Sequence, residues 1–267
     1  MNMSKLGEIM MSEIRQTPEI FSKIIANDQI TPQLATLISD SNIKSILVLA
    51  RGTSDNAAHF MKYLVETQLG LPCGLTSPSS VSIYNSELHY ENTLVVAISQ
   101  SGKSTDLVQF AKSSKESGAK LVSITNDSSS PLAQVADFHL SLQAGPEIAV
   151  AATKSYSAQL LLSYLLVMKW ANKAPHVDKL VSEAEAAIRQ ESGIKEVAKN
   201  LDLKGDLVVL GRGFAYPNAK EAALKIQETC KISVQGLSTA DYLHGPISAL
   251  TPGTSPSSSI FCITNKK

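Results

Sequence analysis

The stretch Val95-Val96-Ala97-Ile98-Ser99-Gln100-Ser101-Gly102-Lys103-Ser104-Thr105-Asp106 decides the fold, because an apolar strand passes there into a helix through a turn of small residues. The apolar run that ends at Ile98 is typical of a strand, and a helix can begin near Asp106. Between them, hydroxyl side chains, one amide and one glycine adjoin the free N–H groups and the positive dipole of a helix start. Such a turn can hold a phosphate dianion, although serines that only cap the helix would explain the same composition.

The same turn excludes one related motif, the nucleotide-binding P-loop. Gly102-Lys103-Ser104 matches the end of that motif, but a P-loop needs a glycine five positions earlier, where Ala97 stands. The turn is also too short to surround a triphosphate. The sequence therefore predicts a site for a monophosphate and not for ATP.

Composition limits the classes of protein to which this chain can belong. Its 267 residues include 24 basic and 24 acidic side chains, so neither a nucleic-acid surface nor an anionic-membrane surface is indicated. The longest apolar run, 160–170, is too short to span a bilayer, and the first residues lack the apolar core of a signal peptide. The three cysteines are widely spaced and lack metal-ligand spacing, which indicates free thiols in a reducing compartment. We therefore expect a cytoplasmic protein with no metal and no other cofactor.

Alternating strands and helices predict the architecture up to residue 170. Helices are expected within 4–26, with an interruption at Pro18, and at 31–39, and a long apolar helix at 151–170. Strands are expected at 45–50, 73–76, 94–98, 121–124 and, as an edge strand, 138–142. This pattern indicates an α/β fold, a doubly wound parallel sheet sandwiched by helices. Ligands of such sheets bind at the carboxyl ends of the strands, where both serine-containing turns lie.

The remainder of the chain repeats this pattern on a smaller scale. Residues 176–200 are expected to form an amphipathic linker helix. Leu207–Gly213 then matches Ile46–Gly52, since each is an apolar strand followed by Arg-Gly, and this match predicts a duplicated domain. Only 61 residues remain from Leu207 onward, about half of what a complete copy needs. The second copy is therefore expected to be truncated, or to be completed by a partner chain.

Four domains are predicted from these observations. They are an N-terminal helical segment (1–45), a first α/β domain that binds phosphate (46–172), a linker helix (173–204) and a partial second copy (205–267). The last of these ends in a low-complexity tail and a short stub at 260–267.

Charged side chains on one predicted helix could carry chemistry. In the helix expected at 217–229, Glu221, Lys225 and Glu228 fall on one face, opposite an apolar face. A solvated stripe with one stabilising Glu–Lys pair is the ordinary explanation. The functional alternative is a carboxylate base that moves a proton between adjacent carbons, beside a lysine that stabilises developing enolate charge. His244 follows a segment with little strand character and lies in a Gly-Pro turn, and a histidine can serve as acid or base at neutral pH.

Four segments resemble motifs of the sugar isomerase (SIS) domain family. Val96–Asp106 looks like its phosphate loop, Ser-Gln-Ser-Gly-x-[Ser/Thr]-x-Asp, and Arg51–Ser54 like its Gly-Thr-Ser turn. Ala144–Lys154 resembles its third signature, and Glu13–Pro18 its N-terminal Glu-Ile-x-x-x-Pro segment. The family resemblance implies a flavodoxin-like fold for the α/β domain.

A fifth segment resembles one branch of that family. Glu221–Glu228, with His244-Gly245-Pro246, is similar to the catalytic end of the isomerase module of glucosamine-6-phosphate synthases. This resemblance implies that Glu228 moves a proton between C1 and C2 and that Lys225 assists the enediol or enolamine. It also implies that His244 opens the sugar ring at a site shared between two subunits, so we expect a homodimer.

The resemblance also implies which residues hold the sugar phosphate. They are Gly52, Thr53, Ser54, Ser99, Gln100, Ser101, Ser104 and the backbone of Val150. Two departures from the synthases stand out: Ala152 replaces a serine, and their C-terminal catalytic lysine has no counterpart in the chain. Nothing in the sequence resembles a glutaminase domain.

The sequence therefore predicts a hexosamine-6-phosphate deaminase/isomerase. It would convert glucosamine 6-phosphate to fructose 6-phosphate and ammonia by aldose–ketose isomerisation and imine hydrolysis. Alternatives are an SIS isomerase or deglycase for galactosamine 6-phosphate or a fructosamine-type substrate, and a non-catalytic sugar-phosphate-binding module. A nucleic-acid-binding regulator is disfavoured, because no basic helix-turn-helix segment precedes residue 45. The expected partners are a sugar phosphate and a second copy of the chain, with no nucleic acid and no membrane.

Overall fold

The computed structural model describes residues 7–40, 42–199, 207–249 and 259–263. It divides the chain into two compact units, Met1–Ala184 and Glu185–Lys267, each of which is described here by itself. The finer domain boundaries that we expect from the sequence remain predictions. Among the described residues, no helix has the length and apolar character that crossing a membrane requires.

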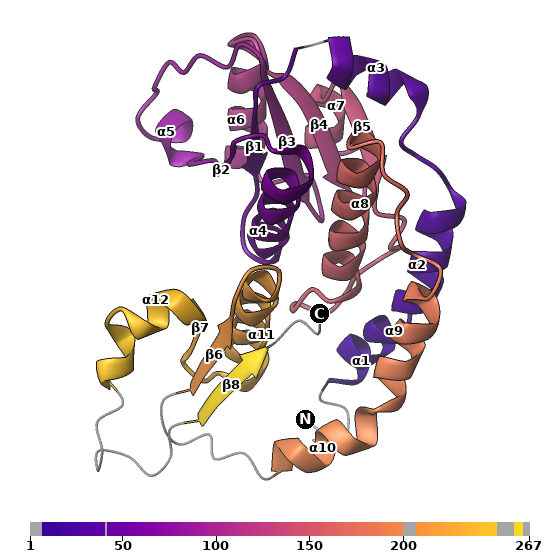
Figure 1. Ribbon diagram of the computed structural model, residues 1–267, viewed down its shortest axis with the longest axis vertical. Helices are drawn as coiled ribbons and strands as arrows, with labels where there is room; N and C mark the ends of the chain where they lie inside the picture. The colour runs from indigo at the N-terminus through magenta and orange to yellow at the C-terminus, as the bar shows by residue number, and fades with distance from the viewer. Residues whose placement is uncertain (1–6, 41, 200–206, 250–258, 264–267) are drawn as a thin grey trace. The chain divides into compact units, whose positions relative to one another are not determined.

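A five-stranded parallel sheet forms the centre of the first unit (Figure 1). Its strands are β1 (Ser45–Leu49), β2 (Cys73–Leu75), β3 (Thr93–Ser99), β4 (Lys120–Thr125) and β5 (Phe138–Ser141). Their order is β2-β1-β3-β4-β5, so β5 is the predicted edge strand and β3 is central and buried along its whole length. The parallel α/β sheet is therefore confirmed, with the strand order of flavodoxin-like folds.

Helices cover both faces of this sheet (Figure 1). One layer contains α2 (Thr17–Ala26), α4 (Thr53–Leu64) and α8 (Lys154–Trp170), of which α8 packs on both α2 and α4. The other contains α5 (Ser79–Ser82), α6 (Thr105–Glu116) and α7 (Pro131–Val135). Alternate residues of the strands face the second layer: Val95 and Ala97 of β3 share a core with Phe110 of α6 and Leu132 of α7.

The helices at the start of this unit, and those that continue from it into the second unit, are interrupted at other positions than expected. The segment expected at 4–26 contains α1 (Glu8–Ile14) and α2, and Pro18 lies in the first turn of α2, where a missing N–H is tolerated. The second expected helix is α3 (Pro32–Asp40). A short π-helix, Val65–Leu69, continues α4. The single linker helix expected at 176–200 is two helices, α9 (Leu180–Arg189) and α10 (Glu191–Lys199), neither of which has a buried residue.

The second unit contains a three-stranded parallel sheet. Its strands are β6 (Leu207–Gly211), β7 (Val234–Ser238) and β8 (Ser259–Ile263), in the order β7-β6-β8. Helices α11 (Ala215–Cys230) and α12 (Thr239–Leu243) and a 3₁₀ turn at Pro246–Ala249 complete it. The central position of β6 matches that of β1 among the first three strands of the larger sheet. Duplication and truncation nevertheless remain predictions.

Two strands of this unit were missed by the sequence prediction. β8 lies within what we expected to be a stub, and β7 lies where little strand character was expected. Gln235 and Gly236 interrupt the apolar pattern of β7. Gly236 is required there, because a Cβ atom would come within 2.6 Å of the Lys220 Cα on α11. Close packing of helix on strand therefore explains why the strand lacks its usual sequence signal.

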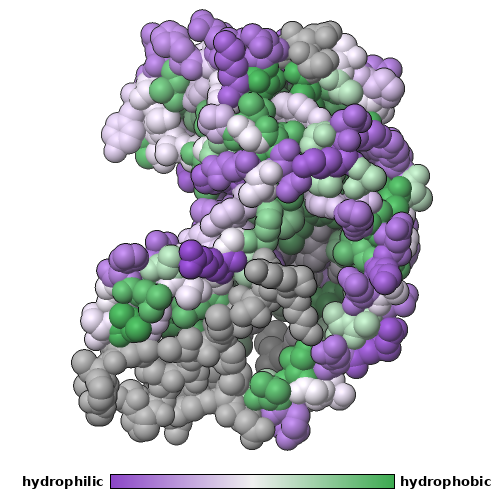
Figure 2. All heavy atoms as spheres, in the orientation of Figure 1, coloured by the Kyte–Doolittle hydropathy of each residue, from purple (hydrophilic) through white to green (hydrophobic). Residues whose placement is uncertain are grey.

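Apolar surface remains exposed on the second unit. Figure 2 shows hydrophobic residues over α12 and the turn after it, where Leu243 and Ile247 are 61% and 43% exposed. Ile194 and Val197 are similarly exposed on α10.

Candidate functional site

The two predicted phosphate-binding turns lie next to each other at the carboxyl edge of the first sheet. β1 and β3 are hydrogen-bonded neighbours with Leu49 opposite Ala97, so the turns that follow them start side by side. Arg51, in the first turn, donates from Nε to the Asp106 carboxylate after the second, at 3.0 Å. The strand order reverses between β1 and β3, and ligands of open α/β sheets bind at such a point.

Hydrogen bonds within the loop after β3 hold it in a curled conformation. The Ser99 hydroxyl accepts the Gly102 N–H at 3.1 Å, and the Ser101 hydroxyl accepts the Lys103 N–H at 3.3 Å. Gly102 has a φ of +65°, and a Cβ atom there would come within 2.7 Å of the Ser130 Cβ. Only glycine fits this position without strain.

Ser104 tests the alternative explanation that the serines only cap a helix. It is the N-cap residue of α6, yet its side chain makes no capping hydrogen bond. The backbone N–H groups and the positive end of the α6 dipole therefore adjoin an exposed hydroxyl that does not serve the helix itself. This arrangement favours an anion site over a plain capped turn.

The positive side chains around the loop are already paired with carboxylates. Lys103 Nζ lies 3.3 Å from Asp127 Oδ2, and Arg51 pairs with Asp106. Hydrogen bonds from Ser129, and then Lys103, hold the pKa of Asp127 below its usual range. A phosphate at this site would therefore depend mainly on hydroxyl and backbone N–H donors.

The turn after β1 presents a second buried hydroxyl. Gly52 has a φ of +57° and precedes α4, whose first turn contains the half-buried Thr53 and the buried Ser54. Gln159 Nε2, on α8, donates a hydrogen bond to the Ser54 Oγ at 3.0 Å. Gln159 was not predicted, because 105 residues separate it from Ser54 and no local pattern marks it.

Asn126 ties the loop after β3 to the segment that contains Val150. Its backbone N–H donates to the Gln100 carbonyl at 3.0 Å. Its side chain accepts the Ala144 N–H at 3.0 Å and donates to the Gly145 carbonyl at 2.6 Å. Asn126 was also missed, although its position directly after β4, at the same sheet edge, was a usable signal. Val150 itself is 97% exposed.

The N-terminal helices hold the base of that segment. The buried Glu13 carboxylate, on α1, accepts the Ile148 N–H at 2.5 Å and the Ala149 N–H at 3.3 Å. The buried Lys154 ammonium donates to Gln16 Oε1 at 2.8 Å and to the Pro146 carbonyl at 2.5 Å. The Glu-Ile-x-x-x-Pro segment therefore orders the 146–154 segment.

Glu147 forms hydrogen bonds within the same segment, 146–154, and at the start of α8. Its carboxylate accepts the backbone N–H groups of Thr153 and Ser155, at 2.9 and 3.2 Å, and the Ser155 hydroxyl. It thus occupies the N-terminus of α8, where a negative charge is stabilised by the helix dipole. The third family signature is therefore a self-capping helix start.

In the second unit, α11 holds the predicted catalytic charges together. Lys225 Nζ lies 3.2 Å from Glu221 Oε1 and 2.6 Å from Glu228 Oε2. The three side chains are only 8%, 16% and 30% exposed for Glu221, Lys225 and Glu228. The Glu–Lys pair of the ordinary explanation is therefore present, but the cluster is partly buried and not fully solvated. A carboxylate held beside an ammonium is the arrangement that proton transfer next to a carbonyl needs.

His244 lies apart from these charges within its unit. It ends α12, its N–H donates to the Asp241 carbonyl, and its side chain is exposed. α11 runs back from the carboxyl end of β6, so Glu228, in its last turn, lies toward the amino edge, whereas His244 follows the carboxyl end of β7. No hydrogen bond among the described residues joins the His244 side chain to Lys225 or Glu228. A site shared between subunits therefore remains a prediction.

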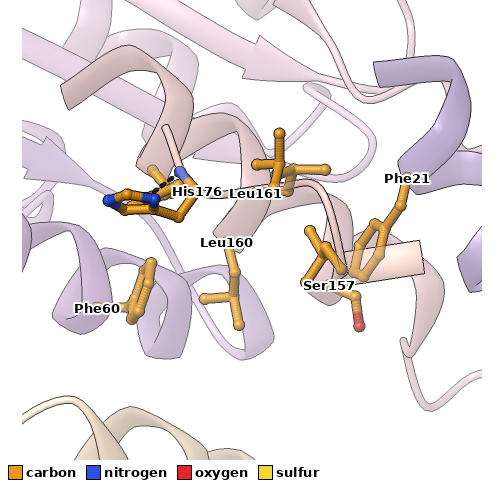
Figure 3. Close-up of a pocket in the computed structure, with 9 residues that line it drawn as sticks. Phe21, Phe60, Ser157, Leu160, Leu161 and His176 are labelled. Carbon is orange, nitrogen blue, oxygen red and sulfur yellow. Dashed lines mark hydrogen bonds between the residues drawn. The ribbon is translucent and has the colours of Figure 1, made fainter. Parts of the chain in front are cut away.

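Two further features concern metal ions and cavities. In the part of the chain that the structure describes, no cluster of His, Cys, Asp or Glu could hold a metal ion. A pocket of about 230 Å³ lies between α2, α4 and α8, lined by apolar side chains such as Phe21, Phe60 and Leu160, with His176 at one side (Figure 3). It contains none of the predicted site residues.

The fold and the loop after β3 define an α/β protein with a candidate phosphate-binding turn, and the comparisons identify its family. A family model described as SIS domain matches residues 39–169. A solved structure of a candidate phosphosugar isomerase from Silicibacter pomeroyi is 32% identical, with a TM-score of 0.75, covering 90% of this chain and 74% of that chain. The chain belongs to the SIS domain family.

Two further relatives show which members of the family this chain is similar to. The chain is 33% identical over 271 residues to glutamine–fructose-6-phosphate aminotransferase (isomerizing) of Thermococcus kodakarensis, covering 94% of this chain and 44% of the relative. The C-terminal domain of glucosamine-fructose-6-phosphate aminotransferase from Francisella tularensis is 26% identical, with a TM-score of 0.80, covering 98% of this chain and 77% of that chain. The chain thus spans less than half the length of the curated relatives it matches.

Proposed function

We propose that the chain converts glucosamine 6-phosphate to fructose 6-phosphate and ammonia. The observation that carries this proposal is the curled serine loop at the point where the strand order reverses, in a member of the SIS family. The names of the relatives, which refer to glucosamine and fructose 6-phosphate, support an amino-hexose 6-phosphate as the ligand.

The phosphate is assigned to the first unit. The oxygens of a phosphate dianion only accept hydrogen bonds. The donors available to them are the N–H groups of the loop and the hydroxyls of Ser54, Ser99, Ser101 and Ser104. Gly52, Thr53 and Gln100 shape the two turns, and the Val150 backbone is assigned to the sugar. Because the nearby cations are paired, exclusion of water and donor geometry would determine affinity more than net charge.

The chemistry is assigned to the charges of α11. In the open-chain aldose, the Glu228 carboxylate removes the C2 proton and returns it to C1, while one proton of the amine passes to the C1 oxygen. These transfers leave an imine at C2 and a hydroxyl at C1. The Lys225 ammonium stabilises the oxygen charge that develops in the enolamine. Water then adds to C2, and ammonia leaves as the ketone forms. His244 is assigned to ring opening, because an exposed imidazole can exchange protons with the ring oxygen at neutral pH.

The deamination direction is the one proposed, because its only co-reactant is water. Synthesis of the amino sugar would require a source of ammonia as a second substrate. A sugar-phosphate-binding module is the second candidate function, and the separation of His244 from Glu228 within the second unit favours it. Related sugars, such as galactosamine 6-phosphate, are alternatives that competition with glucosamine 6-phosphate would separate.

The test is release of ammonia and fructose 6-phosphate from glucosamine 6-phosphate without glutamine, combined with thermal unfolding. Equimolar release that Glu228→Gln abolishes supports the proposal. No release, with a melting temperature that still rises with ligand, supports the binding module, since ligand at 100 times Kd adds about 2.7 kcal/mol to the free energy of unfolding. Neither release nor a rise in melting temperature contradicts both. Turnover that persists in Glu228→Gln contradicts the assigned base.

A further inference from the structure

The hydrogen bond between Gln159 and Ser54 is a side-chain contact that joins α8 to the first turn of α4. Gln159 is fully buried and Ser54 is 7% exposed, and Gln159 Nε2 lies 3.0 Å from Ser54 Oγ. The two helices lie side by side over the sheet (Figure 1). The contact therefore places a buried amide directly behind a predicted phosphate ligand.

The direction of this hydrogen bond determines what Ser54 can do. A hydroxyl has one proton to donate and two lone pairs that accept. Because Gln159 donates, Ser54 accepts, and its own proton stays available for another acceptor. No other hydrogen bond of the Ser54 hydroxyl is formed among the described residues.

The same direction recurs at two other serines of the site. The Ser99 and Ser101 hydroxyls accept the N–H groups of Gly102 and Lys103. All three hydroxyls thus accept a hydrogen bond from the protein and keep their protons for a ligand. A phosphate offers only acceptors, so hydroxyls that keep their protons free suit it.

The Oε1 atom of Gln159 indicates that core packing alone does not explain a glutamine at this position. Its Oε1 is buried and has no hydrogen-bond partner in the described structure. An unsatisfied buried acceptor destabilises the fold, and an apolar side chain of the same length would avoid that penalty. The amide therefore costs stability that an apolar side chain of similar length would not cost.

We propose that Gln159 is a positioning residue that fixes the Ser54 hydroxyl, so that its proton points to the bound sugar phosphate. The inference rests on the proposed function and adds a residue that the family motifs do not assign to the site. Gln159 itself touches no substrate. Loss of its amide would let the Ser54 proton rotate toward other acceptors and would weaken phosphate binding without changing the chemical step.

The experiment compares Gln159→Met with Ser54→Ala, the double variant and a matched control. Ser163→Ala is the control, because Ser163 lies one turn later on α8, is fully buried and likewise has no hydrogen-bond partner among the described residues. The Kd of glucosamine 6-phosphate is measured by calorimetry, steady-state kinetics give KM and kcat, and thermal unfolding without ligand reports stability.

The proposal expects Gln159→Met to raise Kd and KM about tenfold with kcat within about twofold, since an unfixed Ser54 hydroxyl would lose most of its hydrogen bond to the charged phosphate. The melting temperature without ligand should stay unchanged or rise. In the Ser54→Ala background, Gln159→Met should change Kd less than twofold, because its effect passes through Ser54. Ser163→Ala should bind as the wild type does.

Two results would overturn the inference. Gln159→Met with wild-type affinity would show that the amide does not orient Ser54, and additive losses in the double variant would show that it acts elsewhere. If Gln159→Met does not fold, Gln159→Leu and the comparison of Ser54→Ala with Ser163→Ala give the same decision. Absence of binding by the wild type would instead remove the proposed function, and this inference with it.

Discussion

The Glu13 carboxylate accepts the backbone N–H of Ile148 at 2.5 Å, across 135 residues of sequence. The same carboxylate also receives the N–H of Ala149. Consecutive N–H groups that converge on one anion form a tight backbone turn. The first helix of the chain therefore belongs to the α/β unit through this contact and sets the conformation of the segment that leads to Val150.

Replacement of Glu13 by glutamine tests this contact. The neutral amide is a weaker acceptor than a carboxylate, so we expect the free energy of unfolding to fall by about 1–2 kcal/mol. Amide hydrogen exchange should become faster at Ile148 and Ala149, and urea unfolding measures the change in stability.

Glu8→Gln is the control for this variant, because Glu8 is exposed on the same helix. It should change stability by less than about 0.5 kcal/mol. Equal effects of the two substitutions would contradict a special role for Glu13.

Replacement of Gly102 by alanine should damage the phosphate loop. The positive φ costs about 1–2 kcal/mol for a non-glycine residue, and the new Cβ would in addition collide with Ser130. We expect loss of the ligand-induced rise in melting temperature and destabilisation by about 2–4 kcal/mol.

Gly70→Ala separates the effect of the positive φ from the effect of the collision with Ser130. Gly70 has a φ of +66°, but a Cβ atom there would meet nothing within 4 Å. This variant should lose only about 1–2 kcal/mol and keep ligand binding. Ligand binding by Gly102→Ala at wild-type affinity would argue against the loop as the phosphate site.

The first α/β sheet was predictable because its strands are apolar runs bounded by clear turns. Val95 to Ile98 and Leu121 to Ile124 face helices on both sides, so nearly every residue is apolar and the signal is strong. β7 has no such signal, because Gly236 is needed for the approach of α11 and most of the strand is only partly buried. The prediction of β7 failed because close packing against α11, and not hydrophobic periodicity, determines the residue at position 236.

The site residues also fall into two groups, those that a local sequence pattern predicts and those that depend on tertiary packing. The serines after β3 were predicted from local composition, and those after β1 from family motifs, because such motifs are contiguous in sequence. Gln159 and the contact of Glu13 with Ile148 depend on tertiary neighbours that are 105 and 135 residues away in sequence. Local patterns carry no information about such pairs, so only the fold could reveal them.

Stability should fall as the pH drops below neutrality, because of His139. Burial lowers the pKa of His139, and a hydrogen bond with Thr125 and the charge of Asp127 only partly oppose this. The unfolded chain, with a pKa near about 6.5, then binds more protons than the folded chain. The free energy of unfolding should therefore decrease as pH falls through about 6.5 and level off below the folded pKa.

Urea unfolding between pH 5 and pH 8 measures this slope. His139→Gln should flatten it, because the titrating group is removed while the hydrogen bond to Thr125 can be kept. His89→Gln, at an exposed histidine, should leave the slope unchanged. A slope that survives in His139→Gln would assign the pH dependence to other groups.

Removal of the Lys225 ammonium should destabilise the second unit through Glu221. Glu221 is 8% exposed, and Lys225→Met would remove the ammonium that lies 3.2 Å from this nearly buried carboxylate. We expect a loss of about 1–3 kcal/mol, and partial recovery in Lys225→Met with Glu221→Gln, because the double variant removes both charges of the pair.

Lys195→Met provides the comparison within the same unit. Lys195 pairs with Glu191 at 2.6 Å, but its side chain is 70% exposed. Its loss should cost less than about 0.5 kcal/mol, as for most surface pairs. A similar small cost for Lys225→Met would mean that the charges of α11 are solvated after all.

The exposed apolar surface beside His244 predicts self-association. Leu243 and Ile247 flank His244 and are 61% and 43% exposed, and apolar surface of this kind is usual where a second protein binds. Light scattering should give the mass of a dimer for the wild type and of a monomer for Leu243→Asp. If His244 acts in the site of the other copy, Leu243→Asp should also lose ammonia release while keeping the ligand-induced rise in melting temperature. Tyr84→Asp, at an exposed residue of the first unit, is the control and should remain a dimer. A monomeric wild type with full turnover would contradict the shared site and require His244 to act within its own chain.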